Sequence, residues 1–260
     1  MDNIEKIKKL KEEKNAIILA HYYVDEEVQK IADYIGDSFY LAKVASQTEA
    51  DRIVFAGVEF MGESAKILNP NKKVLMPDAF ADCPMAHMIT IKEIKEMREK
   101  YDDLAVVCYI NSTAEIKQYA DVCVTSSNAI KIVKALPQKN IFFIPDQNLG
   151  DFVRRQVPEK NVMTNYGHCP RHTNITLDKL NEVKQKYPEA KIAVHPECKR
   201  EIVEAADFVG STSAIIYYVV QTEAKDFIIG TVDGVFAKIK ELAPNKNLHT
   251  IMDVQVCPNM

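Results

Sequence analysis

The sequence predicts an α/β fold made of three homologous three-layer α/β/α units, each with a parallel four-stranded sheet. Three observations predict it: one segment pattern occurs three times, four landmarks recur in the same order, and helix-like segments alternate with strand-like ones. Strands that alternate with helices are typical of parallel βαβ units, in which helices cover both faces of the sheet. We expect the units at residues 1–86, 87–173 and 174–260, packed around a pseudo-threefold axis.

The first element of each unit is a charged amphipathic helix that leads into an apolar run with β character. This pattern covers residues 4–23, 91–110 and 177–197. Thr90 and Thr176 precede the second and third of these helices as N-caps, and Thr90 forms a capping box with Glu93. Each copy therefore predicts one helix followed by the first strand of a sheet.

Four further landmarks follow in each unit. They are an Ala-Asp pair (32–33, 120–121, 206–207), a hydroxyl cluster (36–38, 125–127, 210–213), a strand that ends in a polar turn and a glycine (54–62, 142–150, 227–234) and Cys-Pro (83–84, 169–170, 257–258). The aspartates lie 88 and 86 residues apart, so the period is nearly constant. Each unit is expected to run helix, strand, helix, short strand, helix, strand, helix, strand.

The composition is that of a globular protein. Of the 260 residues, 47% are hydrophobic and 27% charged, which excludes a disordered chain, a collagen-like fibre and a disulfide-dense scaffold. The net charge of −4 lacks the basic excess of a nucleic-acid-binding protein. The N-terminal residues lack the apolar stretch of a signal peptide, and the longest apolar run, Ala214 to Val220, is too short to span a membrane. We expect a cytoplasmic protein with no nucleic-acid or membrane partner.

Ligands of open parallel sheets bind beyond the carboxyl ends of the strands. In all three units, polar or ionisable residues follow the expected strands. After the first strands come His21, Tyr23, Tyr109, Asn111, His195 and Glu197; after the second, Ser38, Thr125, Ser126, Ser211 and Thr212; after the third, Glu59, Asp146, Asn148, Thr231 and Asp233; and after the fourth, Cys83, Cys169 and Cys257. A threefold arrangement would gather these side chains into one cavity.

Cys83, Cys169 and Cys257 occupy one position of the repeat, and each precedes a proline. A structural zinc site normally has four ligands, often in local Cys-x-x-Cys pairs, and the sequence has no such pair. An iron–sulfur cubane usually has four cysteine ligands, so three would leave one iron open as a Lewis acid. We favour such a cluster, with three buried core cysteines as the alternative. Cys108 and Cys123 lie in apolar runs and are expected in the core.

The hydroxyl clusters are each expected to open a helix, where backbone N–H groups and the helix dipole favour an anion. Plain N-capping explains any one cluster equally well, but three clusters facing one cavity indicate a substrate with several negative groups. His21 and His195 share a repeat position and are candidates for proton transfer or anion binding. His172, three residues after Cys169, is a candidate neighbour of a metal ligand.

Together these residues resemble the quinolinate synthase family, iron–sulfur transferases of NAD (pyridine nucleotide) biosynthesis. The resemblance runs from AHYY (20–23) to VCPNM (256–260), and between them come GDS (36–38), GVEFMGESAKILNP (57–70), CPMA (83–86), YINST (109–113), TSSNA (125–129), PDQNLG (145–150), GHCP-x-H (167–172), HPEC (195–198) and GSTS (210–213). It implies three α/β/α domains and condensation of iminoaspartate with dihydroxyacetone phosphate to quinolinate, with loss of phosphate and two waters. It also implies functional coupling to an L-aspartate oxidase or aspartate dehydrogenase.

The resemblance further implies roles for single residues. Cys83, Cys169 and Cys257 would hold one [4Fe-4S] cluster per chain, whose fourth iron binds substrate. His21, Ser38 and Ser126 would hold the dicarboxylate, and His195, Ser211 and Thr212 the triose phosphate. The catalytic groups would be Tyr23, Tyr109, Asn111, His195 and Glu197, with Glu197 as the general acid–base. Of these, Tyr109, Asn111, His195 and Glu197 would also contact substrate.

One departure from the family pattern concerns the turn after the third strand of the third unit. The family usually has a glutamate directly after the threonine, whereas here Val232 follows Thr231 and Asp233 comes next, which leaves the role of a carboxylate at this turn open. Two other functions fit the same residues less well. One is a non-catalytic iron–sulfur sensor of redox state or oxygen, and the other is a cluster-dependent hydro-lyase acting on a small hydroxy acid.

Overall fold

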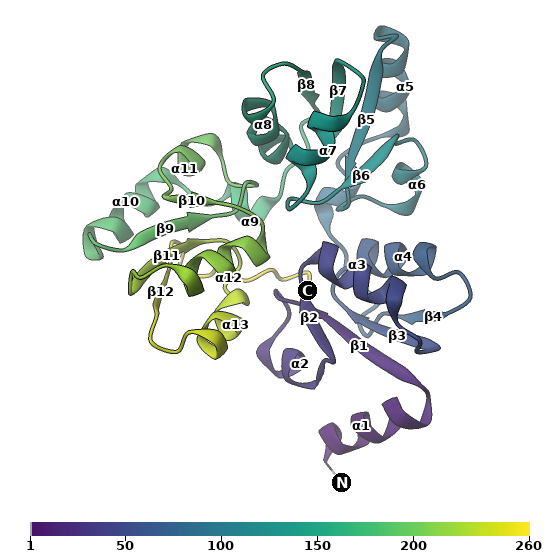
Figure 1. The fold of residues 1–260 in the computed structure, drawn as a ribbon, viewed down its shortest axis with the longest axis vertical. Coiled ribbons are helices and arrows are strands. Elements are labelled where there is room, and N and C mark those ends of the chain that lie inside the picture. The colour runs from purple at the N-terminus through teal and green to yellow at the C-terminus, as the bar shows by residue number, and fades with distance from the viewer. Residues whose placement is uncertain (1) are drawn as a thin grey trace. The chain divides into compact units, whose positions relative to one another are not determined.

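The computed structural model describes residues 2–260, and over this range the chain forms three four-stranded sheets whose strands are all parallel (Figure 1). Every sheet has the same order: the second strand of the unit lies at one edge, followed by the first, third and fourth. Helices and strands alternate within each unit in the expected order. The predicted α/β fold of three repeated units is confirmed.

The chain divides into two compact units. The first runs to Cys83 and takes in Cys257–Met260, and the second spans Pro84–Val256. The last four residues therefore belong with the first sheet, not the third, and Met260 packs against Ala20, Val24 and Ala56. The boundaries after residues 86 and 173 and the pseudo-threefold axis stay predictions.

The first unit contains one sheet flanked by helices. Its strands, in sheet order, are β2 (Tyr34–Gly36), β1 (Ala16–His21), β3 (Arg52–Ala56) and β4 (Lys73–Leu75). Its helices are α1 (Asn3–Glu13), α2 (Glu26–Ile31), α3 (Ser38–Gln47) and α4 (Glu59–Leu68). Leu19, Ile53 and Phe55 of the central strands are buried with Leu41 of α3 and Phe60 of α4. These side chains form the core that holds the helices on the sheet.

The second sheet has the strand order β6 (Val122–Val124), β5 (Leu104–Tyr109), β7 (Asn140–Ile144) and β8 (Asn161–Thr164). Its helical segments are η1 (Pro84–His87), α5 (Ile91–Lys100), α6 (Ala114–Lys117), α7 (Ala129–Ala135) and α8 (Gln147–Gln156). Every residue of β5 is buried, as expected for a central parallel strand. Thr90 caps α5 and forms the predicted capping box with Glu93.

The third sheet has the order β10 (Phe208–Val209), β9 (Lys191–Val194), β11 (Asp226–Gly230) and β12 (Asn247–Thr250). Its helices are α9 (Pro170–Thr173), α10 (Leu177–Lys186), α11 (Arg200–Glu204), α12 (Thr212–Gln221) and α13 (Val235–Leu242). Thr176 caps α10, as predicted. Val194, Ile202 and Ile228 are fully buried between strands and helices.

The three repeated aspartates have one structural role. Each carboxylate accepts a hydrogen bond from a backbone N–H of the first strand of its sheet: Asp33 from Ile18 at 2.7 Å, Asp121 from Val106 at 2.7 Å and Asp207 from Ile192 at 2.8 Å. Each aspartate directly precedes an edge strand of only two or three residues. The carboxylate thus continues the sheet's hydrogen bonding one step beyond a short edge strand.

A repeated lysine ties down a loop in each sheet. The ammonium groups of Lys72, Lys160 and Lys246 donate to backbone carbonyls in the loop before the third strand, with Lys160 Nζ 2.8 Å from the Gln138 oxygen and Lys246 Nζ 2.7 Å from the Ala224 oxygen. These lysines also lie 88 and 86 residues apart. The lysine ammonium groups thus supply donors to loop carbonyl groups that are not paired by hydrogen bonds between strands.

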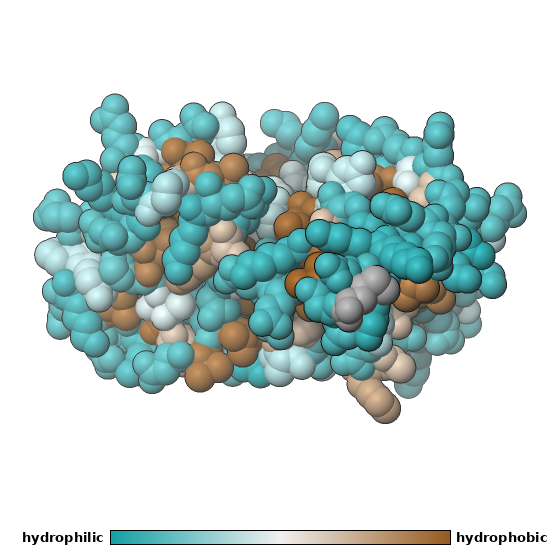
Figure 2. Space-filling view, turned by 90° about the horizontal axis from the view of Figure 1, so that it is seen from below, coloured by the Kyte–Doolittle hydropathy of each residue, from teal (hydrophilic) through white to brown (hydrophobic). Residues whose placement is uncertain are grey.

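The surface is largely polar in the view of Figure 2, where hydrophobic side chains appear as separate patches among hydrophilic ones. None of the helices over residues 2–260 combines the length and the hydrophobicity that a membrane span requires.

The aspartate contact gives a stability prediction. Val106 lies in β5, and every residue of that strand is buried. Asp121→Ala removes the side-chain acceptor of the Val106 N–H. An unsatisfied buried donor costs about 1–3 kcal/mol, so the denaturant midpoint of the second unit should fall accordingly. Asp121→Asn is the matched control, because its amide oxygen still accepts the bond and the loss should be smaller. Equal midpoints for wild type and Asp121→Ala would contradict this role.

Candidate functional site

The carboxyl ends of β5 and β9 bring Tyr109 and Glu197 into contact. Tyr109 is the last residue of β5, and Glu197 lies three residues beyond the end of β9. The Tyr109 hydroxyl donates a hydrogen bond to Glu197 Oε1 at 2.6 Å. Both side chains are buried, and Glu197 is only 3% exposed. Two residues that sequence analysis assigned to proton transfer therefore form a buried pair.

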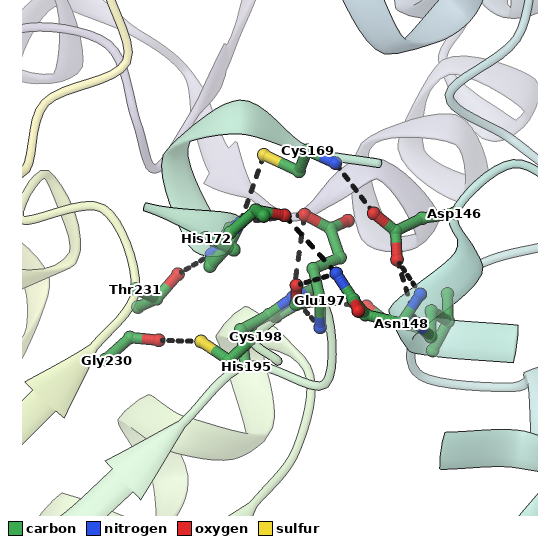
Figure 3. A network of polar contacts seen from close by, with 12 residues as sticks. Asp146, Asn148, Cys169, His172, His195, Glu197, Cys198, Gly230 and Thr231 are labelled. Atoms are coloured by element: carbon green, nitrogen blue, oxygen red, sulfur yellow. Dashed lines mark hydrogen bonds and ion pairs between the residues drawn. The ribbon is translucent and has the colours of Figure 1, made fainter. Parts of the chain in front are cut away.

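A second partner of Glu197 comes from α9. Glu197 Oε2 lies 2.8 Å from His172 Nδ1, which is also 3.2 Å from Cys169 Sγ, and His172 Nε2 lies 2.9 Å from Thr231 Oγ1 (Figure 3). Helix α9 starts directly after Cys169 with Pro170, a residue favoured at the first helical position. The short helix sets His172 one turn after Cys169, in contact with its sulfur, and that His172 neighbours a metal ligand stays a prediction.

His195 completes the set of groups around Glu197. Its Nδ1 accepts a hydrogen bond from the Glu197 N–H at 3.3 Å and lies 3.8 Å from Glu197 Oε2. Its Nε2 lies 3.2 Å from Ser126 Oγ of the second sheet. The rings of His195 and His172 are tilted by 30° relative to each other, with centroids 4.8 Å apart. The predicted site residues Tyr109, Ser126, His195 and Glu197 thus meet within the second unit.

Two buried carboxyl groups in this site have opposite electrostatic surroundings. Burial by itself raises the pKa of Glu197, but the charges of His195 and His172 and hydrogen bonds from His172 and Tyr109 outweigh it and hold the pKa below its ordinary value. Burial and the neighbouring charge of Glu197 raise the pKa of Asp146 well above its ordinary value. Glu197 is therefore the group that holds the negative charge of the site.

Asp146 and Asn148 hold the backbone around these groups. Asp146 Oδ1 accepts the N–H groups of Asn148 and Leu149 at 2.7 and 2.8 Å, which caps α8, and Oδ2 accepts the N–H of Cys169 at 2.7 Å (Figure 3). Asn148 Nδ2 donates to the Glu197 carbonyl at 3.0 Å. Sequence analysis located both residues at a strand end but assigned them no role. The available signal was the polar PDQN turn directly after an apolar strand.

Cys169, His172 and Glu197 form a group that could hold a metal ion, because their ligand atoms all lie within 4.8 Å of one another. Sequence analysis predicted Cys83, Cys169 and Cys257 as the ligand set. All three are half-buried; Cys169 belongs to the second unit, and the other two belong to the first. That the three converge stays a prediction.

His21 and Tyr23 of the first unit repeat the geometry of His195 and Glu197. His21 ends β1, is buried, and accepts the Tyr23 N–H at Nδ1 at 3.2 Å, as His195 accepts the Glu197 N–H. The rings of His21 and Tyr23 meet edge to face with centroids 4.5 Å apart. Ser38 is the first residue of α3, whose N-cap is Asp37. The histidine of this repeat position is thus held by the same local turn in both units.

The hydroxyl clusters differ in their position relative to the start of the helix that follows. Ser211 is the N-cap of α12 and Thr212 its first residue, and both are buried. By contrast, the expectation that a helix opens at residues 125–127 is wrong, since α7 begins at Ala129. The reason is a turn in which the Asn128 side chain accepts the Thr125 N–H at 2.7 Å and delays the helix. Ser126 reaches His195 from this turn instead.

The remaining predicted residues have varied surroundings. Asn111 is half-buried, and within residues 2–260 its Oδ1 is buried without a hydrogen-bond partner. Cys108 is in the core as expected, but the same expectation for Cys123 is wrong, because Cys123 is exposed on the edge strand β6. Cys198 is buried, its Sγ lies 3.3 Å from the Gly230 carbonyl oxygen, and burial raises the pKa of its thiol. The turn residue Asp233 has a pKa raised by burial.

Comparison with known proteins identifies the family of this chain. Residues 5–260 match the family model described as "Quinolinate synthetase A protein". A quinolinate synthase from Fusobacterium nucleatum is 59% identical over 256 residues, which cover 98% of this chain and 85% of that protein.

Two further relatives carry the same name. A quinolinate synthase from Aquifex aeolicus is 52% identical over 242 residues, covering 93% of this chain and 75% of that protein. One from Clostridioides difficile is 48% identical over 254 residues, covering 98% and 84% respectively. With a family model that spans nearly the whole sequence and relatives this similar, the chain belongs to the quinolinate synthase family, the enzymes of NAD biosynthesis that form quinolinate.

Proposed function

We propose that this enzyme condenses iminoaspartate with dihydroxyacetone phosphate to quinolinate, with release of phosphate and two waters. The observation that carries the proposal is the buried, ionised Glu197 held between Tyr109 and His172 beside Cys169. Two dehydrations and a ring closure need proton transfers at several atoms, and this group offers an acceptor and a donor in one buried cluster. Iminoaspartate is short-lived, so an L-aspartate oxidase or aspartate dehydrogenase would supply it.

We assign one [4Fe-4S] cluster to Cys83, Cys169 and Cys257. These three cysteines are half-buried, whereas Cys108 and Cys198 are enclosed in the core. Asp146 fixes the backbone N–H of Cys169, and His172 contacts its sulfur, as expected for groups that orient a ligand. With three thiolate ligands, one iron of such a cluster stays open and supplies a Lewis acid for hydroxyl or carboxylate oxygens.

Proton transfer falls to the Tyr109–Glu197 pair. The donors that keep Glu197 ionised also make it a weak base, so the proton that moves most readily is the one shared with the Tyr109 hydroxyl. Tyr109 can give that proton to a leaving oxygen and, once deprotonated, take one back from substrate; Glu197 accepts the hydrogen bond of the protonated hydroxyl. His195, Tyr23 and Asn111 are the further catalytic groups of this proposal.

Substrate anions are assigned to the polar ends of the strands. The N-cap Ser211 and Thr212 open α12, where backbone N–H groups favour a phosphate, and His195 joins them in holding the triose phosphate. His21, Ser38 and Ser126 are assigned to the dicarboxylate. The unpartnered Oδ1 of Asn111 would accept a hydrogen bond from a substrate hydroxyl or imine N–H, since a buried acceptor without a donor is costly.

An iron–sulfur sensor on the same scaffold is disfavoured by one observation. A sensor needs ligands for its cluster but no buried acid–base group, and here Glu197 is 3% exposed with a donor from each of two other elements. The direct test is anaerobic turnover of iminoaspartate and dihydroxyacetone phosphate, followed as quinolinate formed and phosphate released in equal amounts. An iron-loaded protein that forms no quinolinate would overturn the proposal.

Glu197→Gln should retain the fold and the iron but lose about 10²–10⁴-fold in quinolinate formation, because the amide keeps the shape but lacks the negative charge that supports proton transfer by Tyr109. The measurement is the turnover rate of anaerobically prepared protein, with iron content determined on the same sample. Glu201→Gln, the same substitution at an exposed position in α11, is the matched control and should be near wild type. Comparable rates for the two variants would move the acid–base role elsewhere.

Replacing the cysteines one at a time should divide them into two groups. Cys83→Ala, Cys169→Ala and Cys257→Ala should each lose stable iron, because two remaining thiolates do not hold a cubane against water. Cys198→Ala should keep it and cost on the order of 1–2 kcal/mol of packing. Iron and sulfide analysis of proteins prepared without oxygen measures this. Full iron in any variant of the first group would show that the ligands are wrongly assigned.

A further inference from the structure

Cys108 and Cys123 lie side by side on neighbouring strands, apart from the cysteines assigned to the cluster. Cys108 is the penultimate residue of β5 and Cys123 the middle residue of β6, and they are register partners in this parallel pair. Adjacent strands lie about 4.8 Å apart. That spacing is within the roughly 4.4–6.8 Å between Cα atoms in disulfides. Register partners of a parallel pair have their side chains on the same face of the sheet, so the two thiols lie next to each other.

The two thiols have opposite environments. Cys108 is fully buried among Ile116, Phe142 and other core residues, whereas Cys123 is exposed at the sheet edge. The hydrogen bond from Cys108 and the positive charge of Lys117, at the end of α6, lower the pKa of Cys123 to about 7 against the opposing effect of burial. The same hydrogen bond and burial raise the pKa of Cys108 well above its ordinary value.

This asymmetry is that of an attacking and a resolving thiol. The thiolate is the nucleophile in disulfide exchange, and an attacking thiol works best when its pKa is near the ambient pH and its sulfur is accessible. Cys123 meets both conditions. Cys108 cannot meet a reagent from solvent, but it is the register partner of the cysteine on which a mixed disulfide would form.

We propose that Cys108 and Cys123 form a thiol–disulfide exchange site for small-molecule disulfides, with Cys123 as the attacking and Cys108 as the resolving residue. The Cys123 thiolate attacks one sulfur of the disulfide, forms a mixed disulfide and releases one thiolate. Cys108 then loses its proton to that thiolate or to solvent and attacks the Cys123 sulfur, which releases the second thiol. The pair of cysteines is oxidised by two electrons, and the small disulfide is reduced to two thiols.

The test uses the full iron-loaded chain and glutathione disulfide without oxygen, with N-ethylmaleimide to block remaining thiols and peptide mapping without reduction. Wild type should yield a peptide pair joined through Cys108 and Cys123. Cys108→Ala should instead keep one glutathionyl group on Cys123, because nothing resolves it, and Cys123→Ser should react at neither position. A Cys108→Ala protein unmodified at Cys123, or a wild type that stays glutathionylated, would overturn the proposal.

A second variant avoids the core, where Cys108→Ala could disturb folding. Lys117→Gln removes the charge that favours the Cys123 thiolate, so Cys123 should be modified several-fold more slowly at neutral pH. Lys131→Gln, on the neighbouring helix α7, is the matched control and should leave the rate unchanged. A Lys117→Gln rate equal to the control would contradict the thiolate assignment.

Discussion

An ionised carboxylate in a nearly dry interior is stable only when other groups supply the hydrogen bonds that water would have made. Glu197 is such a group, and it takes its donors from Tyr109 of β5 and His172 of α9, with His195, directly after β9, alongside. These contacts join the second and third sheets across otherwise separate hydrophobic cores. Removal of any one donor would leave the buried charge of Glu197 partly unpaired. The hydrogen bonds to Glu197 therefore fix the positions of these strand ends, in addition to the packing of the cores.

Much of the fold could be predicted because it depends on local patterns that occur three times. Amphipathic helices and apolar strands are visible in the sequence, and three copies at one period support each other. The strand order was beyond this reasoning, since periodicity does not say which strands pair. Cys123 shows the limit: the apolar run around it indicates a core strand, but a three-residue strand at a sheet edge exposes one of its faces.

The sequence predicted which residues lie at the strand ends, but not which of their side chains are in contact. The rule that ligands bind beyond strand ends located Tyr109, His195 and Glu197 correctly, because it depends only on topology. It could not show that Tyr109 meets Glu197, 88 residues further along the chain. Asp146 and Asn148 were missed as positioning residues because they act on backbone groups of Cys169 and Glu197, and such contacts leave no spacing pattern in the sequence.

The short edge strands have a consequence for solubility. A long unpaired strand edge is a template for another chain, and proteins commonly protect such edges with charges or by keeping them short. Here β2, β6 and β10 end the sheets after two or three residues, which would leave the next N–H of the central strand available to a foreign strand. Asp33, Asp121 and Asp207 occupy that N–H with a charged carboxylate, so the device that completes each sheet also makes its edge a poor site for aggregation.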